Sequence, residues 1–428
     1  MLAHYACHSP QHRLARRQFL GTLTAGAGVV SGLNFLAAPA FSQELQRRDR
    51  RMLVIDLHGG LSQLESWDPK PGTDTGGPFR PIATSVPGIH ISELLPLTAQ
   101  QMHHLTIVRS VDTAEDDHGK GNYMMLHGRR QTPASDFPTL GAVVAKAITP
   151  IDSPLPGHVM VTPHGSGGRS NDASYLGPRY ASIVLGGGKP PQNTDRPDGL
   201  TPQMDASRQS LRKQLDDSFY SRRRSARAEA YTFSYDQAQQ LLERRDVFDL
   251  SQEPEADFDR YGRCDFGRMC VLARRLLEKG ITYVKVTHTN YDSHNENFIF
   301  HLEQLGEFDR AFANLIADLA ERGLLEHTLI VVLSEFGRTP RINHLFGRDH
   351  WSRAWSVVLG GVKLPRGGVY GKTNDQGTAV VENKVDHANL FHTYLQALGI
   401  DSTGTFHIDG REIPIADPAS HPIKDLLG

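Results

Sequence analysis

The stretches ITYVKVTHTNYDSH (Ile281–His294) and LIVVLSEFGR (Leu329–Arg338) decide the fold of this 428-residue chain. In both, a short apolar run rich in β-branched residues ends in polar residues, which indicates a buried strand followed by a turn. Acids and histidines stand just after each apolar run. In open α/β sheets, ligands bind beyond the carboxyl ends of the strands, so these residues are predicted to gather at one functional edge.

The same alternation extends over most of the chain. Between the two stretches, Ile299–Gly323 carries apolar residues at helical spacing. Further strands are predicted at Met52–Leu57, Leu105–Ser110, His158–Thr162, Ser182–Gly188 and Trp355–Leu359, and further helices at Asp116–Arg130, Asp257–Lys279 and Asp386–Gly399. Strands that alternate with helices predict an α/β fold with a mostly parallel sheet covered on both faces.

The N-terminus indicates where the protein works. Residues 15–20, ARRQFL, form a twin-arginine core, and an apolar stretch rich in Gly and Ala follows to about Ala40. We expect residues 1–42 to be a twin-arginine signal peptide that the twin-arginine export machinery recognises. The apolar stretch is short and weakly apolar for a membrane span, so no stable membrane anchor is expected after cleavage. The protein would then be periplasmic or secreted.

Composition limits the function classes and the domain organisation. The chain has 46 Lys and Arg against 48 Asp and Glu, and these charges are mixed, which argues against nucleic acid as a partner. Residues 43–428 suit a single domain, with a strongly charged helical insertion expected at about residues 190–255. Cys264 and Cys270 lie six residues apart in a predicted helix and do not share a face, so no disulfide is expected between them.

Ligand-type residues follow the two deciding strands. Asp292 and His294 are two residues apart, so they can share one metal, or the acid can orient the ring. The alternative is a turn in which Asp292 caps the next helix. Glu335 ends a buried strand, where an unpaired charge is costly, so a metal or Arg338 is its expected partner. His350 is the strongest single candidate for a metal ligand, although any lone histidine among 21 is more often structural.

The segment DDHGKGNY (residues 116–123) places polar side chains at the start of a predicted helix. Because a helix start presents free N–H groups and favours anions, His118 is a candidate to attack a substrate, bind a metal or hydrogen-bond the substrate. The alternative is simple helix capping by Asp116 or Asp117. Lys120 and Arg338 are candidates to bind a substrate anion, since the forked donors of arginine match phosphate or sulfate.

Together these motifs resemble a bacterial family of secreted proteins, the domain-of-unknown-function family numbered 1501, and its sulfatase-like and alkaline-phosphatase-like relatives. The resemblance rests on GGLSQLESWDPKP (59–71), DHGKGNYMMLHGRR (117–130), YDSHNENF (291–298), SEFGRTPRIN (334–343) and GRDHW (347–351). It implies an alkaline-phosphatase-like three-layer α/β/α fold. It also implies one or two divalent metals, which we expect to be zinc, calcium or manganese, beyond the carboxyl edge of the sheet.

The resemblance also implies roles for individual residues. The implied metal ligands are Asp292, His294, Glu335 and His350. The acid after the first strand stays open between Asp56, Glu65 and Asp68. His118 would stand where relatives carry a hydroxyl or thiol nucleophile, and Phe336 follows Glu335 where a histidine is expected. These two departures leave enough ligand-type residues for one metal rather than two.

Three functions follow from the resemblance and its departures. The first is a secreted, metal-dependent hydrolase of phosphate or sulfate esters, acting on a small molecule or a polysaccharide. The second is a non-catalytic envelope protein that binds a sulfated polysaccharide or a protein partner through a degenerate site. The third is a phosphomutase-type transferase, which would form a phosphoenzyme with little net hydrolysis.

Overall fold

A computed structural model of the chain describes residues 49–427, apart from 134–135, 192–196, 223–234, 236–238, 363 and 409. The chain divides into two compact units, Met1–Arg48 and Asp49–Gly428. The signal peptide predicted at residues 1–42 lies outside the described residues, so it stays a prediction.

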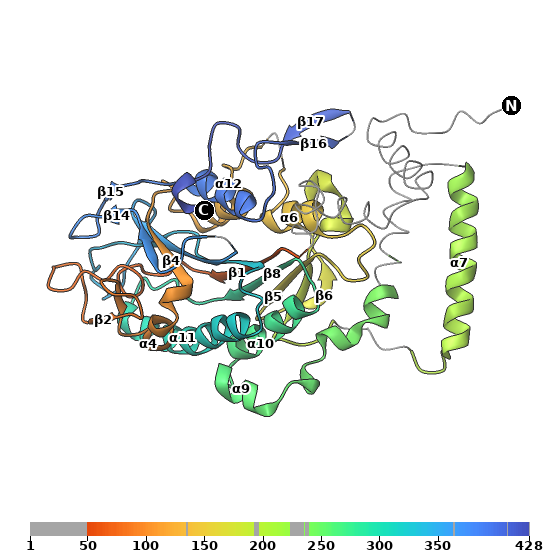
Figure 1. Ribbon diagram of the computed structural model, residues 1–428, viewed down its shortest axis with the longest axis horizontal. Coiled ribbons are helices and arrows are strands. Elements are labelled where there is room, and N and C mark those ends of the chain that lie inside the picture. The colour runs from red at the N-terminus through yellow and green to blue at the C-terminus, as the bar shows by residue number, and fades with distance from the viewer. Residues whose placement is uncertain are drawn as a thin grey trace, which may run out of the picture. The chain divides into compact units, whose positions relative to one another are not determined.

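A central sheet lies between the helices of the second unit (Figure 1). It has nine strands in the order β13-β4-β12-β9-β1-β8-β5-β7-β6. Its strands are β1 (Arg51–Leu57), β4 (Leu105–Val111), β5 (His158–Thr162), β6 (Ser166–Arg169), β7 (Ile183–Gly186), β8 (Tyr283–His288), β9 (Thr328–Leu333), β12 (Trp355–Gly361) and β13 (Gly368–Tyr370). β12 pairs antiparallel with both neighbours and β6 pairs antiparallel with β7, whereas the other pairings are parallel. The predicted mostly parallel sheet is therefore confirmed.

Helices cover both faces of this sheet (Figure 1). On one face lie α4 (Pro96–Gln100), α9 (Glu255–Tyr261), α10 (Asp265–Glu278) and α11 (Asn297–Glu321), and on the other lie α5 (His118–His127), α6 (Leu140–Ile148) and α12 (His387–Ala397). Side chains of β1 alternate between the two cores: Leu53 and Ile55 pack in the first, Met52 and Val54 in the second. This double burial explains the continuous apolar runs and confirms the three-layer α/β/α architecture.

Short elements complete the second unit. Two-stranded sheets pair β2 (Pro81–Ala83) with β3 (His90–Ser92), β10 (Gly337–Arg338) with β11 (His350–Trp351), β14 (Lys372–Thr373) with β15 (Val380–Glu382), and β16 (Thr405–Ile408) with β17 (Arg411–Pro414). Single 3₁₀ turns are η1 (Met102–His104), η2 (Ser174–Leu176), η3 (Pro178–Tyr180), η4 (Arg245–Phe248), η5 (Leu250–Gln252) and η6 (Lys424–Leu426).

The helix predicted at Asp257–Lys279 is wrong in one respect, because the structure divides it into α9 and α10. Gly262 separates them with a φ of +92°, a conformation that glycine adopts without strain. Cys264 then caps α10, with its Sγ accepting a hydrogen bond from the N–H of Gly267. Tertiary packing thus favours two shorter helices where the sequence indicates one.

The charged stretch at about residues 190–255 contains α7 (Pro202–Arg222), followed by η4 and η5. Its status as an insertion, and the boundaries of the single domain, stay predictions. None of the helices in the described ranges combines the length and the apolar character that crossing a membrane requires.

Candidate functional site

Three neighbouring parallel strands bring polar loops to one edge of the sheet. β1 pairs with β8 on one side and with β9 on the other. The chain continues from β8 to Asp292 and from β9 to Glu335, and the β10–β11 pairing sets Arg338 opposite His350. Gly59, just after β1, has a φ of +117°, and a Cβ there would lie 2.7 Å from the backbone nitrogen of Asp292. Glycine at this position therefore permits the loop after β1 to contact the loop after β8.

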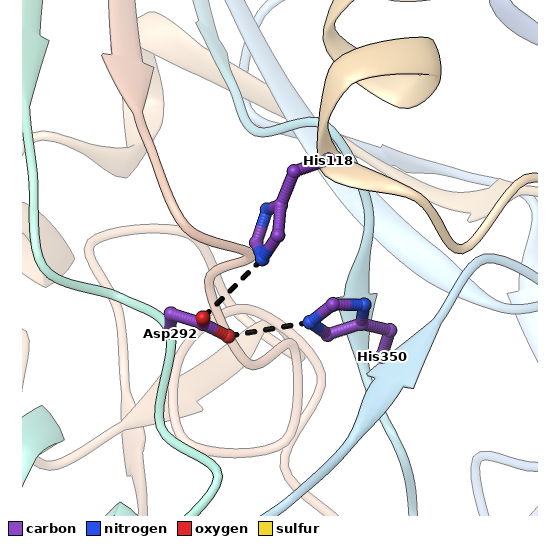
Figure 2. Close-up of side chains that lie close together, drawn as sticks. All are labelled: His118, Asp292 and His350. Atoms are coloured by element: carbon purple, nitrogen blue, oxygen red, sulfur yellow. Dashed lines mark hydrogen bonds and ion pairs between the residues drawn. The ribbon is translucent and has the colours of Figure 1, made fainter.

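Three imidazoles approach the carboxylate of Asp292, two of which are drawn in Figure 2. Nε2 of His118 lies 3.3 Å from Asp292 Oδ2, and Nε2 of His350 lies 3.3 Å from Asp292 Oδ1. Nε2 of His294 lies 3.1 Å from Asp292 Oδ1 and 2.9 Å from His350 Nε2. We name these four residues the Asp292 cluster. The structure thus brings together three of the four predicted metal ligands, with His118 as the fourth member.

The other ring nitrogen of each histidine faces an acceptor. Nδ1 of His118 lies 2.6 Å from Glu335 Oε1. Nδ1 of His294 lies 2.8 Å from Asp349 Oδ1, and Nδ1 of His350 lies 2.6 Å from the carbonyl oxygen of Asp116. Since carboxylates and carbonyls only accept hydrogen bonds, we infer that each Nδ1 carries a proton and donates it. In the neutral form of each ring, Nε2 then presents a lone pair to the Asp292 carboxylate.

Lone pairs and carboxylate oxygens that converge in this way need a cation or a shared proton between them. Nε2 of His118 is buried and has no hydrogen-bond partner among the described residues, although Asp292 Oδ2 is near. Ligand atoms of His118, Asp292 and His350 all lie within 4.8 Å of one another. Histidines that bind a metal usually donate their other N–H to a carboxylate or a carbonyl, as these three do. The cluster therefore has the donor set of a divalent metal site.

Glu335 lies behind His118 rather than among the atoms that face Asp292. Its carboxylate is buried, accepts the Nδ1–H of His118, and accepts the backbone N–H of Gly59 at 2.9 Å. Burial raises the pKa of Glu335, but the hydrogen bond with His118 and the nearby His58 outweigh it, so the pKa is lowered overall. The geometry favours an orienting role over direct metal ligation, and its partner is His118 rather than Arg338.

Arg338 is fully buried, and its guanidinium is committed to the protein. Nε donates to the carbonyl of Gly60 at 2.8 Å, Nη1 donates to the carbonyl of Arg348 at 3.0 Å, and Nη2 donates to Gly59. The same Nη2 lies 2.5 Å from Asp292 Oδ1. These contacts favour a role in holding the loops and Asp292, while binding of a substrate anion by Arg338 stays a prediction. Lys120 is exposed in the first turn of α5.

The local electrostatics keep Asp292 ionised. Partial burial raises the pKa of Asp292, but the hydrogen bond from Arg338 and the adjacent imidazoles outweigh it and lower the pKa to about 2. The hydrogen bond with Glu335 raises the pKa of His118. Burial lowers the pKa of His350, which favours its neutral, lone-pair form. A metal at the cluster must therefore compete with a proton mainly at His118.

The three candidates for the first-strand acid each have a cationic partner in the protein. Asp56 lies 2.9 Å from the amine of Lys285, Glu65 lies 2.8 Å from the guanidinium of Arg348, and Asp68 lies 3.0 Å from the amine of Lys70. Asp56 also belongs to a second group of possible ligands, with His58 and Glu335. The choice among the three acids stays open.

Sequence reasoning missed the partners that orient the histidines. Asp349 contacts the ring of His294, which lies 55 residues away in the sequence. The carbonyl of Asp116 contacts the ring of His350, which lies 234 residues away. Asp349 carried a usable signal, because it directly precedes His350. Phe336 also contributes: its buried ring lies 4.8 Å from the ring of His118 and 4.4 Å from that of His350, measured between centroids. It forms an apolar floor beneath two of the imidazoles.

Comparison with known proteins shows the family and a set of distant structures. The model of a family described as "Protein of unknown function (DUF1501)" matches residues 49–427. No curated protein matches the chain.

Similar solved structures include the lipoteichoic acid synthase LtaP from Listeria monocytogenes, with 8% identity, 87% of this chain and 76% of that chain covered, and a TM-score of 0.39. The PsFucS1 sulfatase from Pseudoalteromonas sp. has 12% identity, 85% and 72% coverage, and a TM-score of 0.40. The alkaline phosphatase from the Antarctic bacterium TAB5 has 10% identity, 82% and 98% coverage, and a TM-score of 0.36. With TM-scores this low, the chemistry of the cluster has to be argued from its own residues.

Proposed function

This chain belongs to the DUF1501 family, and we propose that it is a metal-dependent hydrolase of phosphate or sulfate esters. One observation carries the proposal: three histidines, each oriented through Nδ1, direct Nε2 toward one ionised carboxylate. The Nε2 lone pairs converge on a carboxylate whose cationic partner among the described residues is Arg338, and a bound metal would satisfy these lone pairs together.

We propose His118, Asp292, His294 and His350 as the metal ligands. Three imidazoles and one carboxylate suit zinc best, with manganese next and calcium least, since calcium prefers a shell of oxygen atoms. Bound there, the ion would supply a Lewis acid for the ester and lower the pKa of a water. Side chains of Asp292 and His294 are 47% and 44% exposed, so a substrate in solution can reach the cluster.

In this proposal His118 is a ligand rather than the attacking group. Its Nδ1 is engaged by Glu335 and its Nε2 points at Asp292, so the nitrogen that could attack is the one that the metal needs. The residues around it hold and orient: Glu335 orients His118, Asp349 orients His294, and Arg338 positions Asp292. Lys120, exposed two residues further along α5, is the cation that we propose for the charged end of the ester.

Two further observations bear on the proposal, one from the sequence and one from the structure. The twin-arginine core at residues 15–20 supports export of the folded protein to the periplasm or beyond. The buried Phe336 beside His118 and His350 favours the alternative, a non-catalytic envelope protein with a degenerate site. That protein would bind a sulfated polysaccharide or a protein partner.

The test begins with the metal content of the purified mature protein and of its His350→Ala and Asp292→Ala variants. His344→Ala is the matched control, because His344 is an exposed histidine in the same loop. Stoichiometric metal in the wild type and the control, lost in the other two, supports the site. A panel of phosphate and sulfate esters then separates the functions, since metal without turnover favours the binding protein. No metal after reloading with zinc, manganese and calcium would overturn the proposed ligand set.

A further inference from the structure

A cavity lies at the end of α5 that is remote from His118. It has a volume of about 620 Å³ and lies beside the first turn of α12. Arg129 and Arg130, which follow α5, line it together with Asp386, His387 and Asp417. Because the ten residues of α5 span about 15 Å, the cavity is separate from the Asp292 cluster. Its volume is in the range of small-molecule sites, roughly 300–1,000 Å³.

The charges that line this cavity balance. Two guanidinium groups, of Arg129 and Arg130, are matched by two carboxylates, of Asp386 and Asp417. A phosphate or sulfate ion would meet both carboxylates, and a metal cation would meet both guanidinium groups. The lining therefore suits neither a small anion nor a metal ion.

The first turn of α12 is likewise closed to an anion. The carboxylate of Asp386 already accepts the backbone N–H groups of Ala388 and Asn389 and thereby caps the helix. The cavity instead has a buried side-chain nitrogen that can bind a ligand. His387 is only 8% exposed, yet its buried Nδ1 has no hydrogen-bond partner in the part of the chain that the structure describes. A buried polar atom without a partner is uncommon in a folded protein and points to a ligand or a water.

The cavity lining contains both hydrogen-bond donors and acceptors. Arg130 Nη2 donates a hydrogen bond to the carbonyl of Thr113, its Nη1 lies 4.0 Å from Glu115 Oε2, and its side chain is 56% exposed. Asp417 Oδ1 accepts the N–H of Ala419, and among the described residues no hydrogen bond to its Oδ2 is found. Ser420 and Thr132 add hydroxyl groups to the lining.

We propose that this cavity binds an uncharged, polyhydroxylated ligand, namely a saccharide unit. Each sugar hydroxyl donates one hydrogen bond and accepts others, so it can satisfy carboxylates and guanidinium groups in the same small space. Net neutrality of the lining matches a ligand without charge. The inference does not depend on the proposed hydrolase activity, because no residue of the Asp292 cluster lines the cavity.

The test is binding of the full mature chain to an array of immobilised neutral, amino-bearing and sulfated oligosaccharides. The best neutral glycan is then titrated in solution against the wild type and the variants Arg130→Gln and Asp417→Asn. Both substitutions are near the surface, and Asn can keep the hydrogen bond to Ala419. Asp375→Asn is the matched control, because Asp375 is an exposed acid that lines a different cavity.

We expect neutral glycans to bind the wild type and the control, and each cavity variant to bind at least tenfold more weakly. Treatment with a chelator should leave this binding unchanged, which separates the cavity from the metal cluster. Three results would each overturn the proposal: no binding of neutral glycans, equal binding by all variants, or a preference for a zwitterion such as phosphocholine over every glycan.

Discussion

Glu335→Gln removes one negative charge from the residue that orients His118 and leaves its size unchanged. Glu335 is buried, and its Oε1 lies 2.6 Å from His118 Nδ1. A neutral amide accepts this hydrogen bond more weakly and makes the imidazole a poorer ligand. Loss of such a partner typically weakens metal binding by about 10- to 100-fold, or roughly 1.4–2.7 kcal/mol.

The assay is a competitive zinc titration against a chromophoric chelator. It must be run above the pH range in which His118 titrates, because the substitution also relieves proton competition at that ring and would otherwise mask the loss. An NMR titration of the metal-free protein supplies the second readout. The pKa of His118 should fall in the variant, since the hydrogen bond that His118 donates to Glu335 is the main cause of its elevation.

Glu307→Gln is the matched control, because Glu307 pairs with His288, a histidine outside the cluster, at 3.5 Å. Zinc affinity of this control should equal that of the wild type. If Glu335→Gln bound zinc as tightly as the wild type, and the pKa of His118 did not move, the orienting role of Glu335 and the assignment of His118 as a ligand would both be refuted.

Two further predictions concern stability. Arg338→Met should destabilise the protein by about 3 kcal/mol, the lower end of the range for one partner of a buried ion pair, because Asp292 is half exposed; a loss under about 1 kcal/mol in urea unfolding would contradict this. The folded pKa of Asp292 is depressed to about 2, so its stabilising contribution is present above pH about 4 and lost as the pH falls toward 2. Because solvent screens the half-exposed Asp292, this contribution is limited to about 1 kcal/mol. Asp292→Asn should remove it and flatten that part of the profile of stability against pH. A profile equal to that of the wild type would contradict the pairing of Asp292 with Arg338.

Much of the fold is local and could be predicted. Strands β1, β5 and β9 were placed to within one residue, because a strand buried on both faces leaves an unbroken apolar run in the sequence. The separation of α9 from α10 could not be predicted in the same way. It depends on a glycine conformation and on the packing of two helices, and helical spacing continues across the break.

The sequence by itself determined which ligand-type residues stand at the carboxyl edge of the sheet. Asp292, His294 and Glu335 follow neighbouring parallel strands, whose carboxyl ends must meet at one edge of the sheet. Only the tertiary structure decided what each one faces. Glu335 was predicted to hold a metal, and in the structure its carboxylate accepts a hydrogen bond from His118 Nδ1. Arg338 donates to Asp292 and to backbone carbonyls. These contacts join residues up to 279 positions apart, and no local pattern records them. Hydrogen-bond direction and distance select the partner, and both exist only after the strands have paired and the loops have met.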